Sequence, residues 1–85
     1  MTEVELGRVT HYFNKLGVAA IEIEQDSLAV GDTIHIKGHT SDFTQKVDSI
    51  QLEHESVSVA RPGQSVGIRV SGHAHEHDKV LKVLE

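Results

Sequence analysis

The sequence lacks cysteine and tryptophan, and it contains one proline and only three aromatic residues, Tyr12, Phe13 and Phe43. Without cysteine, disulfides, iron–sulfur clusters, thiol catalysis and cysteine-type zinc sites are excluded. No apolar run approaches the roughly 18 residues of a transmembrane helix, and the N-terminal MTEVELGRV does not have the pattern of a signal peptide. We therefore expect a soluble, cytoplasmic protein with no membrane partner.

Positive charge is scarce, because 8 Lys and Arg stand against 13 Asp and Glu, a formal net charge of −5. Autonomous DNA binding requires a dominant positive field, so DNA is not an expected partner. The 85 residues predict one domain, 1–85, with a thin core of valine, isoleucine, leucine and alanine. The final Leu84-Glu85 resembles a cloning remnant, to which we assign no function.

Alternating hydrophobic residues predict strands along most of the chain. Ile21 and Ile23 share one face of such a strand while Glu22 and Glu24 share the other, and residues 33–37 and 66–70 alternate in the same way. No segment has sustained helical spacing with caps. Residues 77–83 fit a helical turn or a terminal strand equally well.

Turn signals separate these strands at short intervals. Residues 14–17 end in Gly17 and predict a tight hairpin, and Pro62-Gly63 is typical of a type II turn. Val47 is out of phase with the alternation that follows it, which predicts a β-bulge. Together these patterns predict an all-β fold, a small closed antiparallel β-barrel of six to seven strands without exposed edges.

Several glycine-containing segments carry a family resemblance. They are LAVGDTIHI at 28–36, TQKVDSIQ at 44–51, ARPGQSVGIRVSG at 60–72 and HDKV at 77–80. In this order, over residues 7–83, they resemble the second, β-barrel domain of elongation factor Tu and related translational GTPases. The resemblance implies a non-catalytic binding module that contacts tRNA, rRNA or the ribosome, or a protein partner.

The same resemblance indicates where such a partner would bind. The positions that align with the family's aminoacyl-end pocket fall near Gln51, Glu53 and His54, although Glu53 and His54 differ from the family's residues there. Lys37, Lys46, Arg61 and Arg69 form a candidate basic patch, with Arg61 in a turn and Arg69 facing outward on the next strand. We take Gln51, Glu53, His54, Arg61 and Arg69 as the candidate RNA or partner site.

Motifs for nucleotide chemistry and for catalysis are absent from the sequence. There is no Gly-x-x-x-x-Gly-Lys-Ser/Thr loop, and Asn14-Lys15-Leu16-Gly17 lacks the aspartate that would read guanine. Neither Ser41-Asp42 nor Ser56 and Ser58 lie in a nucleophile elbow or at triad spacing. The sequence therefore predicts no enzymatic activity, no bound nucleotide and no cofactor.

Histidine is plentiful, with seven residues, and His73, His75 and His77 alternate along the chain. On a strand these three imidazoles would share one face and could bind a first-row metal. In an exposed loop between the last two strands they would have no such role. Two alternatives to the translation-related function thus remain open, a protein-interaction adaptor unrelated to translation and a minor histidine-based metal-binding role.

Overall fold

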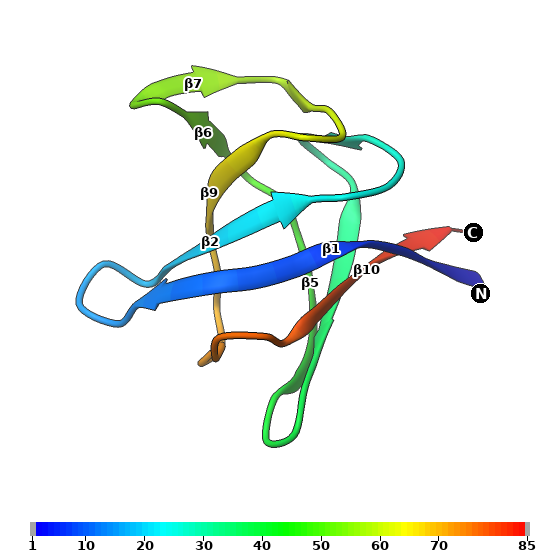
Figure 1. The fold of residues 1–85 in the computed structure, drawn as a ribbon, viewed down its shortest axis with the longest axis vertical. Coiled ribbons are helices and arrows are strands. Elements are labelled where there is room, and N and C mark those ends of the chain that lie inside the picture. The colour runs from blue at the N-terminus through cyan, green and yellow to red at the C-terminus, as the bar shows by residue number, and fades with distance from the viewer. Residues whose placement is uncertain (1, 85) are drawn as a thin grey trace.

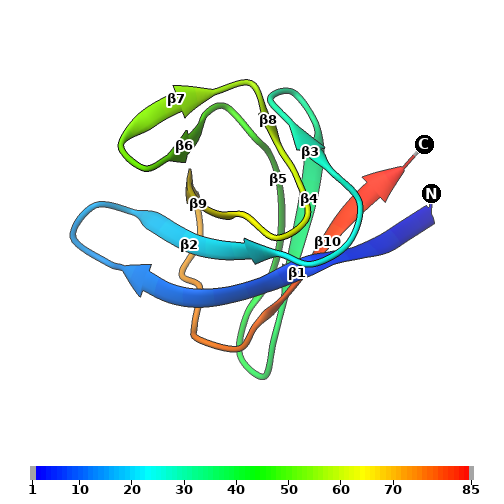
Figure 2. The same cartoon turned by 45° about the horizontal axis from the view of Figure 1, so that its top comes forward.

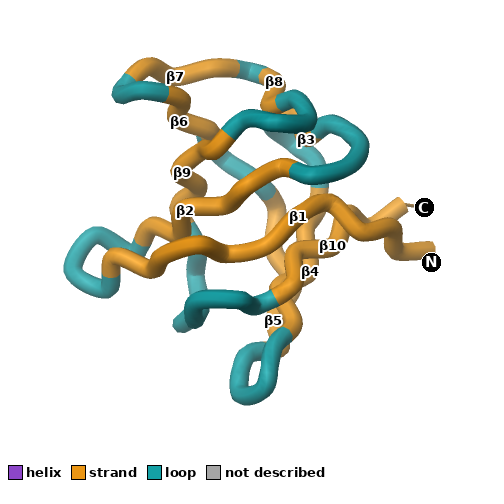
Figure 3. Tube along the Cα trace, in the orientation of Figure 1, coloured by secondary structure: helices purple, strands orange, loops and turns teal. Residues whose placement is uncertain are grey.

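The computed structural model describes residues 2–84, and all of its regular elements are strands. They are β1 (Thr2–Phe13), β2 (Val18–Ile23), β3 (Leu28–Ala29), β4 (Thr33–Lys37), β5 (Asp42–Lys46), β6 (Ile50–Leu52), β7 (Glu55–Val57), β8 (Val59–Ala60), β9 (Ser65–Arg69) and β10 (Lys79–Leu84). Every strand pair is antiparallel, which confirms the predicted all-β antiparallel class. Over these residues no helix could span a membrane. Loops occupy the remainder of the tube in Figure 3.

Eight strands form one sheet in the order β5-β4-β10-β1-β2-β9-β6-β7, while β3 and β8 pair separately. The sheet curls strongly, and the two ends of the chain lie side by side (Figure 1). The predicted closed barrel is nevertheless wrong, because the strand order is linear and leaves β5 and β7 as edges. The chain leaves β5 after Lys46 and pairs again only at the opposite end of the sheet, where β6 meets β9.

The core lies inside this curl and consists entirely of aliphatic side chains, as the composition predicted. Sixteen hydrophobic residues are buried, among them the alternating pairs Ile21 and Ile23 of β2 and Ile34 and Ile36 of β4. Burying each such side chain contributes about 1.5–3 kcal/mol to folding. Tyr12 and Phe43 are partly buried and pack against the margin of this cluster.

The strand β1 carries the irregularities that bend the sheet. Its register shifts between Glu5 and Gly7 in the pairing with β10, and between Val9 and His11 in the pairing with β2. A Cβ atom on Gly7 would lie 1.9 Å from the carbonyl oxygen of Glu22, so this close approach requires glycine. The β-bulge predicted at Val47 is wrong, because β5 ends at Lys46 and Val47 lies in the connection between β5 and β6, outside both strands.

The predicted tight turns are confirmed. The amides of Leu16 and Gly17 both donate to the carbonyl of Phe13, at 3.1 and 2.9 Å, and Gly17 has a φ of +67°. In the second turn the amide of Gln64 donates to the carbonyl of Arg61 at 3.1 Å, and Gly63 has a φ of +91°. The first of these turns sets the position of the site described next.

Candidate functional site

Two hairpins project from the same side of the molecule, away from both chain ends (Figure 2). The β1–β2 hairpin presents Phe13 and Leu16, whose exposed fractions of 43% and 66% are high for large apolar residues. Between the hairpins runs a groove of about 420 Å³, lined by residues 13, 16, 18 and 20 of the first hairpin, 51, 53 and 54 of the second, and 65–67 of β9. A groove of this volume with a mainly apolar lining and a few polar groups is the candidate binding site of the domain.

Small residues form the floor of this groove. Ala20 of β2 lies opposite Gly67 of β9, and Gly67 lies opposite Gln51 of β6. A Cβ atom on Gly67 would have its nearest neighbour, a methyl group of Val18, 3.4 Å away. The glycine therefore leaves open space above three adjacent strands.

Three of the predicted site residues come together at the groove. Glu53 and His54 have φ values of +50° and +69°, as the two central residues of a type I′ hairpin turn do, and they line the groove with Gln51. Arg61 and Arg69 do not join them, because they lie before and at the end of β9 respectively. The two arginines of the predicted basic patch are therefore divided between the two ends of that strand.

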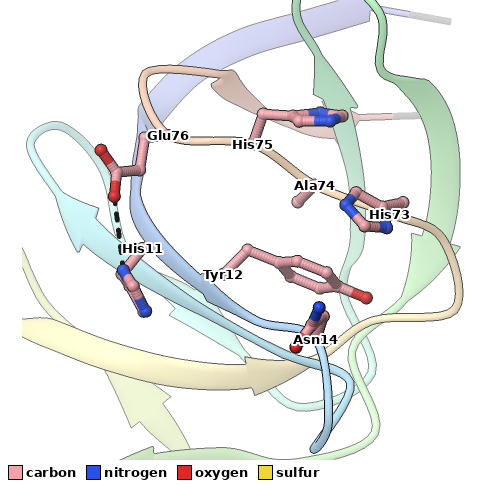
Figure 4. Close-up of a pocket in the computed structure, with 7 residues that line it drawn as sticks. All are labelled: His11, Tyr12, Asn14, His73, Ala74, His75 and Glu76. Carbon is pink, nitrogen blue, oxygen red and sulfur yellow. Dashed lines mark hydrogen bonds and ion pairs between the residues drawn. The ribbon is translucent and has the colours of Figure 1, made fainter.

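A second hollow, of about 290 Å³, lies beside Tyr12 (Figure 4). Two of the three alternating histidines, His73 and His75, line it. The ring centroids of Tyr12 and His73 are 4.6 Å apart, and those of His73 and His75 are 4.8 Å apart. Across the hollow, Nδ1 of His11 lies 3.3 Å from a carboxylate oxygen of Glu76. The ring of His73 thus lies between those of Tyr12 and His75, and each neighbouring pair of rings is tilted.

The segment with the alternating histidines is a loop, so the strand required by the metal-binding hypothesis is not present. His77 has a φ of +75°, which turns the chain into β10. Within residues 2–84 no group of three or more histidine and carboxylate side chains is placed to hold a metal ion.

Ser41, His75 and Asp78 lie close together in a geometry that differs from a catalytic triad. Nδ1 of His75 is 2.8 Å from Oγ of Ser41 and 3.8 Å from a carboxylate oxygen of Asp78, whereas a triad histidine uses both ring nitrogens. Ser41 Oγ also donates to the carbonyl of His73, and Asp78 accepts from the amide of His75. Since Ser41 and Asp78 are 3% and 5% exposed, these contacts fasten the 73–78 loop to the β4–β5 connection.

One charged cluster was missed by the sequence analysis. His35 of β4 lies between Asp42 of β5, at 2.5 Å, and Glu3 of β1, at 2.7 Å. The hydrogen bond to Asp42 raises the pKa of His35 above 6.5; partial burial lowers it, and the hydrogen bond to Glu3 adds to the increase. No sequence signal links these residues, since Glu3 and His35 are brought together by strand pairing alone.

Over residues 2–84 these features describe a small all-β domain with a curled, open sheet and an apolar groove between two hairpins. Its fold is that of the C-terminal domain of the "putative U32 peptidase" of Geobacillus thermoleovorans, with a TM-score of 0.87 at 21% identity, over 95% of this chain and 93% of that one. The selenomethionine variant of that domain gives a TM-score of 0.83 at 24% identity, over 89% and 95% of the two chains.

In sequence, the chain is 37% identical over 84 residues to an uncharacterized protease of Methanocaldococcus jannaschii, covering 98% of this chain and 20% of that protein. It is 37% identical over 81 residues to a collagenase of Porphyromonas gingivalis strain W83, covering 94% and 20%. No family model matches the chain. The chain thus spans about a fifth of the length of the curated relatives it matches.

These likenesses overturn the resemblance to translation factors. The related chains are named proteases and collagenases, and the neighbouring fold is a peptidase's C-terminal domain. The interpretation as a translation-factor barrel that contacts RNA or the ribosome is therefore wrong. Its motifs were glycine turns between short aliphatic strands, which many small curled sheets require, so they mark an architecture rather than a function.

Proposed function

We propose that this chain is the C-terminal accessory domain of a U32-type peptidase and that it contacts the polypeptide substrate while another part of the protein cleaves it. The identities of 37% to a protease and to a collagenase support the link to peptidases. The likeness to an isolated C-terminal domain supports its place in a longer protein.

The geometry around Ser41 is the observation that carries the non-catalytic role. In a serine–histidine–carboxylate triad the serine is accessible and passes its proton to an imidazole that the carboxylate orients through the other ring nitrogen. Ser41 is buried and donates to the carbonyl of His73, and the Asp78 carboxylate accepts from a backbone amide. These three residues therefore serve the loop's structure in our proposal.

The substrate contact belongs to the groove between the two hairpins. Its exposed Phe13 and Leu16 offer apolar area, and Gln51 offers an amide donor and acceptor. Because a curated relative is named a collagenase, we take unfolded collagen as the polypeptide of interest.

Incubation of the 85-residue chain with gelatin and with casein tests whether this chain cleaves protein by itself. We expect no hydrolysis by the chain or by its Ser41→Ala variant. Hydrolysis that Ser41→Ala abolishes would overturn the proposal.

A matching deletion can be made in the Porphyromonas gingivalis relative, removing the region that aligns with this chain. We expect hydrolysis of gelatin to weaken through a higher KM, whereas kcat on a short peptide is retained. Equal loss of both activities would contradict a substrate-contacting role, because it would place the region within the catalytic machinery.

A further inference from the structure

The groove floor is a row of residues that crosses the sheet rather than following a strand. Ala20, Gly67 and Gln51 are consecutive partners on β2, β9 and β6. Neighbouring strands are about 4.8 Å apart, so the row spans roughly 10 Å. That length matches about three residues of an extended chain at 3.1–3.4 Å each.

The shape of the groove admits a polypeptide backbone. With glycine and alanine on its floor, a chain can approach the sheet closely, and Phe13 and Leu16 stand beside it as an apolar wall. A chain lying across the strands cannot pair with their backbone groups. It would instead use the Gln51 amide, which suits a polyproline II segment because such a segment leaves its own peptide groups unpaired.

Charge selects among such chains. Glu53 is the one carboxylate in the lining of the groove, and it takes part in none of the ion pairs found among residues 2–84. The net charge of the whole chain is −5. A lysine or arginine on the bound segment would therefore complement Glu53.

The direction in which the groove opens favours a separate molecule as its occupant. Both hairpins point away from the N-terminal end, where the rest of a longer peptidase would connect to a C-terminal domain (Figure 2). A preceding part of such a protein would join on the side opposite the two hairpins.

We propose that the groove binds an extended glycine- and proline-rich strand that carries a lysine or arginine paired with Glu53. This inference rests on the proposed function and adds to it the location of the contact and the chemical class of the ligand. Single unfolded collagen chains belong to that class, since they repeat Gly-X-Y with abundant proline.

Fluorescence polarisation with a short labelled peptide of Gly-Pro-Lys triplets tests the proposal, beside a matched peptide of Gly-Pro-Glu triplets. We expect saturable binding of the lysine peptide and several-fold weaker binding of the glutamate peptide. Glu53→Lys should weaken binding of the lysine peptide by roughly 3- to 10-fold, while Asp48→Lys, the same charge change at an exposed site outside the groove, leaves it unchanged.

Gly67→Val provides a second variant that fills the floor. Its Cβ atom meets no backbone, and valine favours strands, so thermal unfolding should show a folded protein that no longer binds the peptide. Undiminished binding by both Glu53→Lys and Gly67→Val would overturn the proposal, as would no binding by the folded wild-type chain. A dimer that Gly67→Val dissociates would place a second copy in the groove and would also overturn it.

Mass spectrometry of the same samples keeps the two proposals apart. Cleavage of the peptide by the chain alone would refute the accessory role. An intact peptide that does not bind would refute only the groove assignment.

Discussion

The side chain of Gln45, on the edge strand β5, forms hydrogen bonds with Ser71 and with the backbone of Arg69. Its carbonyl oxygen accepts from the Ser71 amide at 2.6 Å and from the Ser71 hydroxyl at 3.1 Å. Its amide nitrogen donates to the carbonyl of Arg69 at 2.9 Å. One side chain thus forms a bridge between edge strand β5 and the end of β9.

Substitution Gln45→Ala should therefore lower the free energy of unfolding by about 0.5–1.5 kcal/mol, because it removes exposed hydrogen bonds to the Ser71 amide and the Arg69 carbonyl that water can only partly replace. Urea denaturation measures this change. Gln25→Ala is the matched control, since the hydrogen bond found for its side chain among residues 2–84 is an exposed one to Glu5 at 3.4 Å. Equal effects of the two substitutions would show that the bridge does not stabilise the curled sheet.

The limits of sequence analysis follow from the same contact. The turn at 14–17 was predicted correctly because its information is local, with the glycine at the position that needs positive φ. The contact between Gln45 and Ser71 joins residues 26 positions apart, and no local sequence pattern predicts it. The general need to protect sheet edges suggested closure, and a single glutamine provides part of that protection instead.

The candidate site also depends on contacts between residues far apart in the sequence, which local patterns do not predict. Glu53 and His54 were singled out through a mistaken resemblance, and the groove they line depends on the non-local register of Ala20, Gly67 and Gln51. The alternating histidines were expected to share a face only on a strand. That strand does not form there, because the Asp78 carboxylate holds the amide of His75 in a turn.

Replacement by alanine should destabilise the protein at one strand glycine, Gly7, and have little effect at another, Gly67. Gly7→Ala places Cβ 1.9 Å from the backbone oxygen of Glu22, so β1 and β2 must separate, and we expect a loss of about 1–3 kcal/mol or more. Gly67→Ala meets only a methyl group at 3.4 Å and should change stability by less than about 0.5 kcal/mol. Thermal unfolding of both variants measures the difference. A tolerated Gly7→Ala would show that the bulge in β1 can relax.

Asp78 should control the order of the histidine loop. Asp78→Ala removes the buried acceptor of the His75 amide, 2.9 Å away, and should cost about 1–3 kcal/mol. Hydrogen exchange at the His75 amide should become faster in that variant. Asp48→Ala, at an exposed position, serves as the control and should leave exchange in this loop unchanged. Unaltered exchange in Asp78→Ala would mean that other contacts hold the loop.

The cluster of His35, Asp42 and Glu3 should make stability depend on pH. The pKa of His35 is raised in the folded protein, chiefly by the hydrogen bond to Asp42, above the 6.5 of an unperturbed imidazole. Below 6.5 the proton is bound in both states and the cluster contributes in full. As pH rises through the folded pKa, the native state loses this proton as well, and the contribution disappears.

Urea denaturation of the wild type and of His35→Gln measures this effect, because glutamine preserves polarity without titrating. The wild type should exceed the variant in stability by more at about pH 5.5, below the unperturbed pKa of an imidazole, than at about pH 8.5. In NMR titrations, Asp42→Asn should lower the midpoint of His35, since it removes the charge that favours the imidazolium. Glu76→Gln, which alters only the partner of His11, should leave that midpoint in place. A stability difference that does not change with pH would mean that solvent screens the three charges in the folded protein, since only a proton held more tightly in the folded state can couple this cluster to pH.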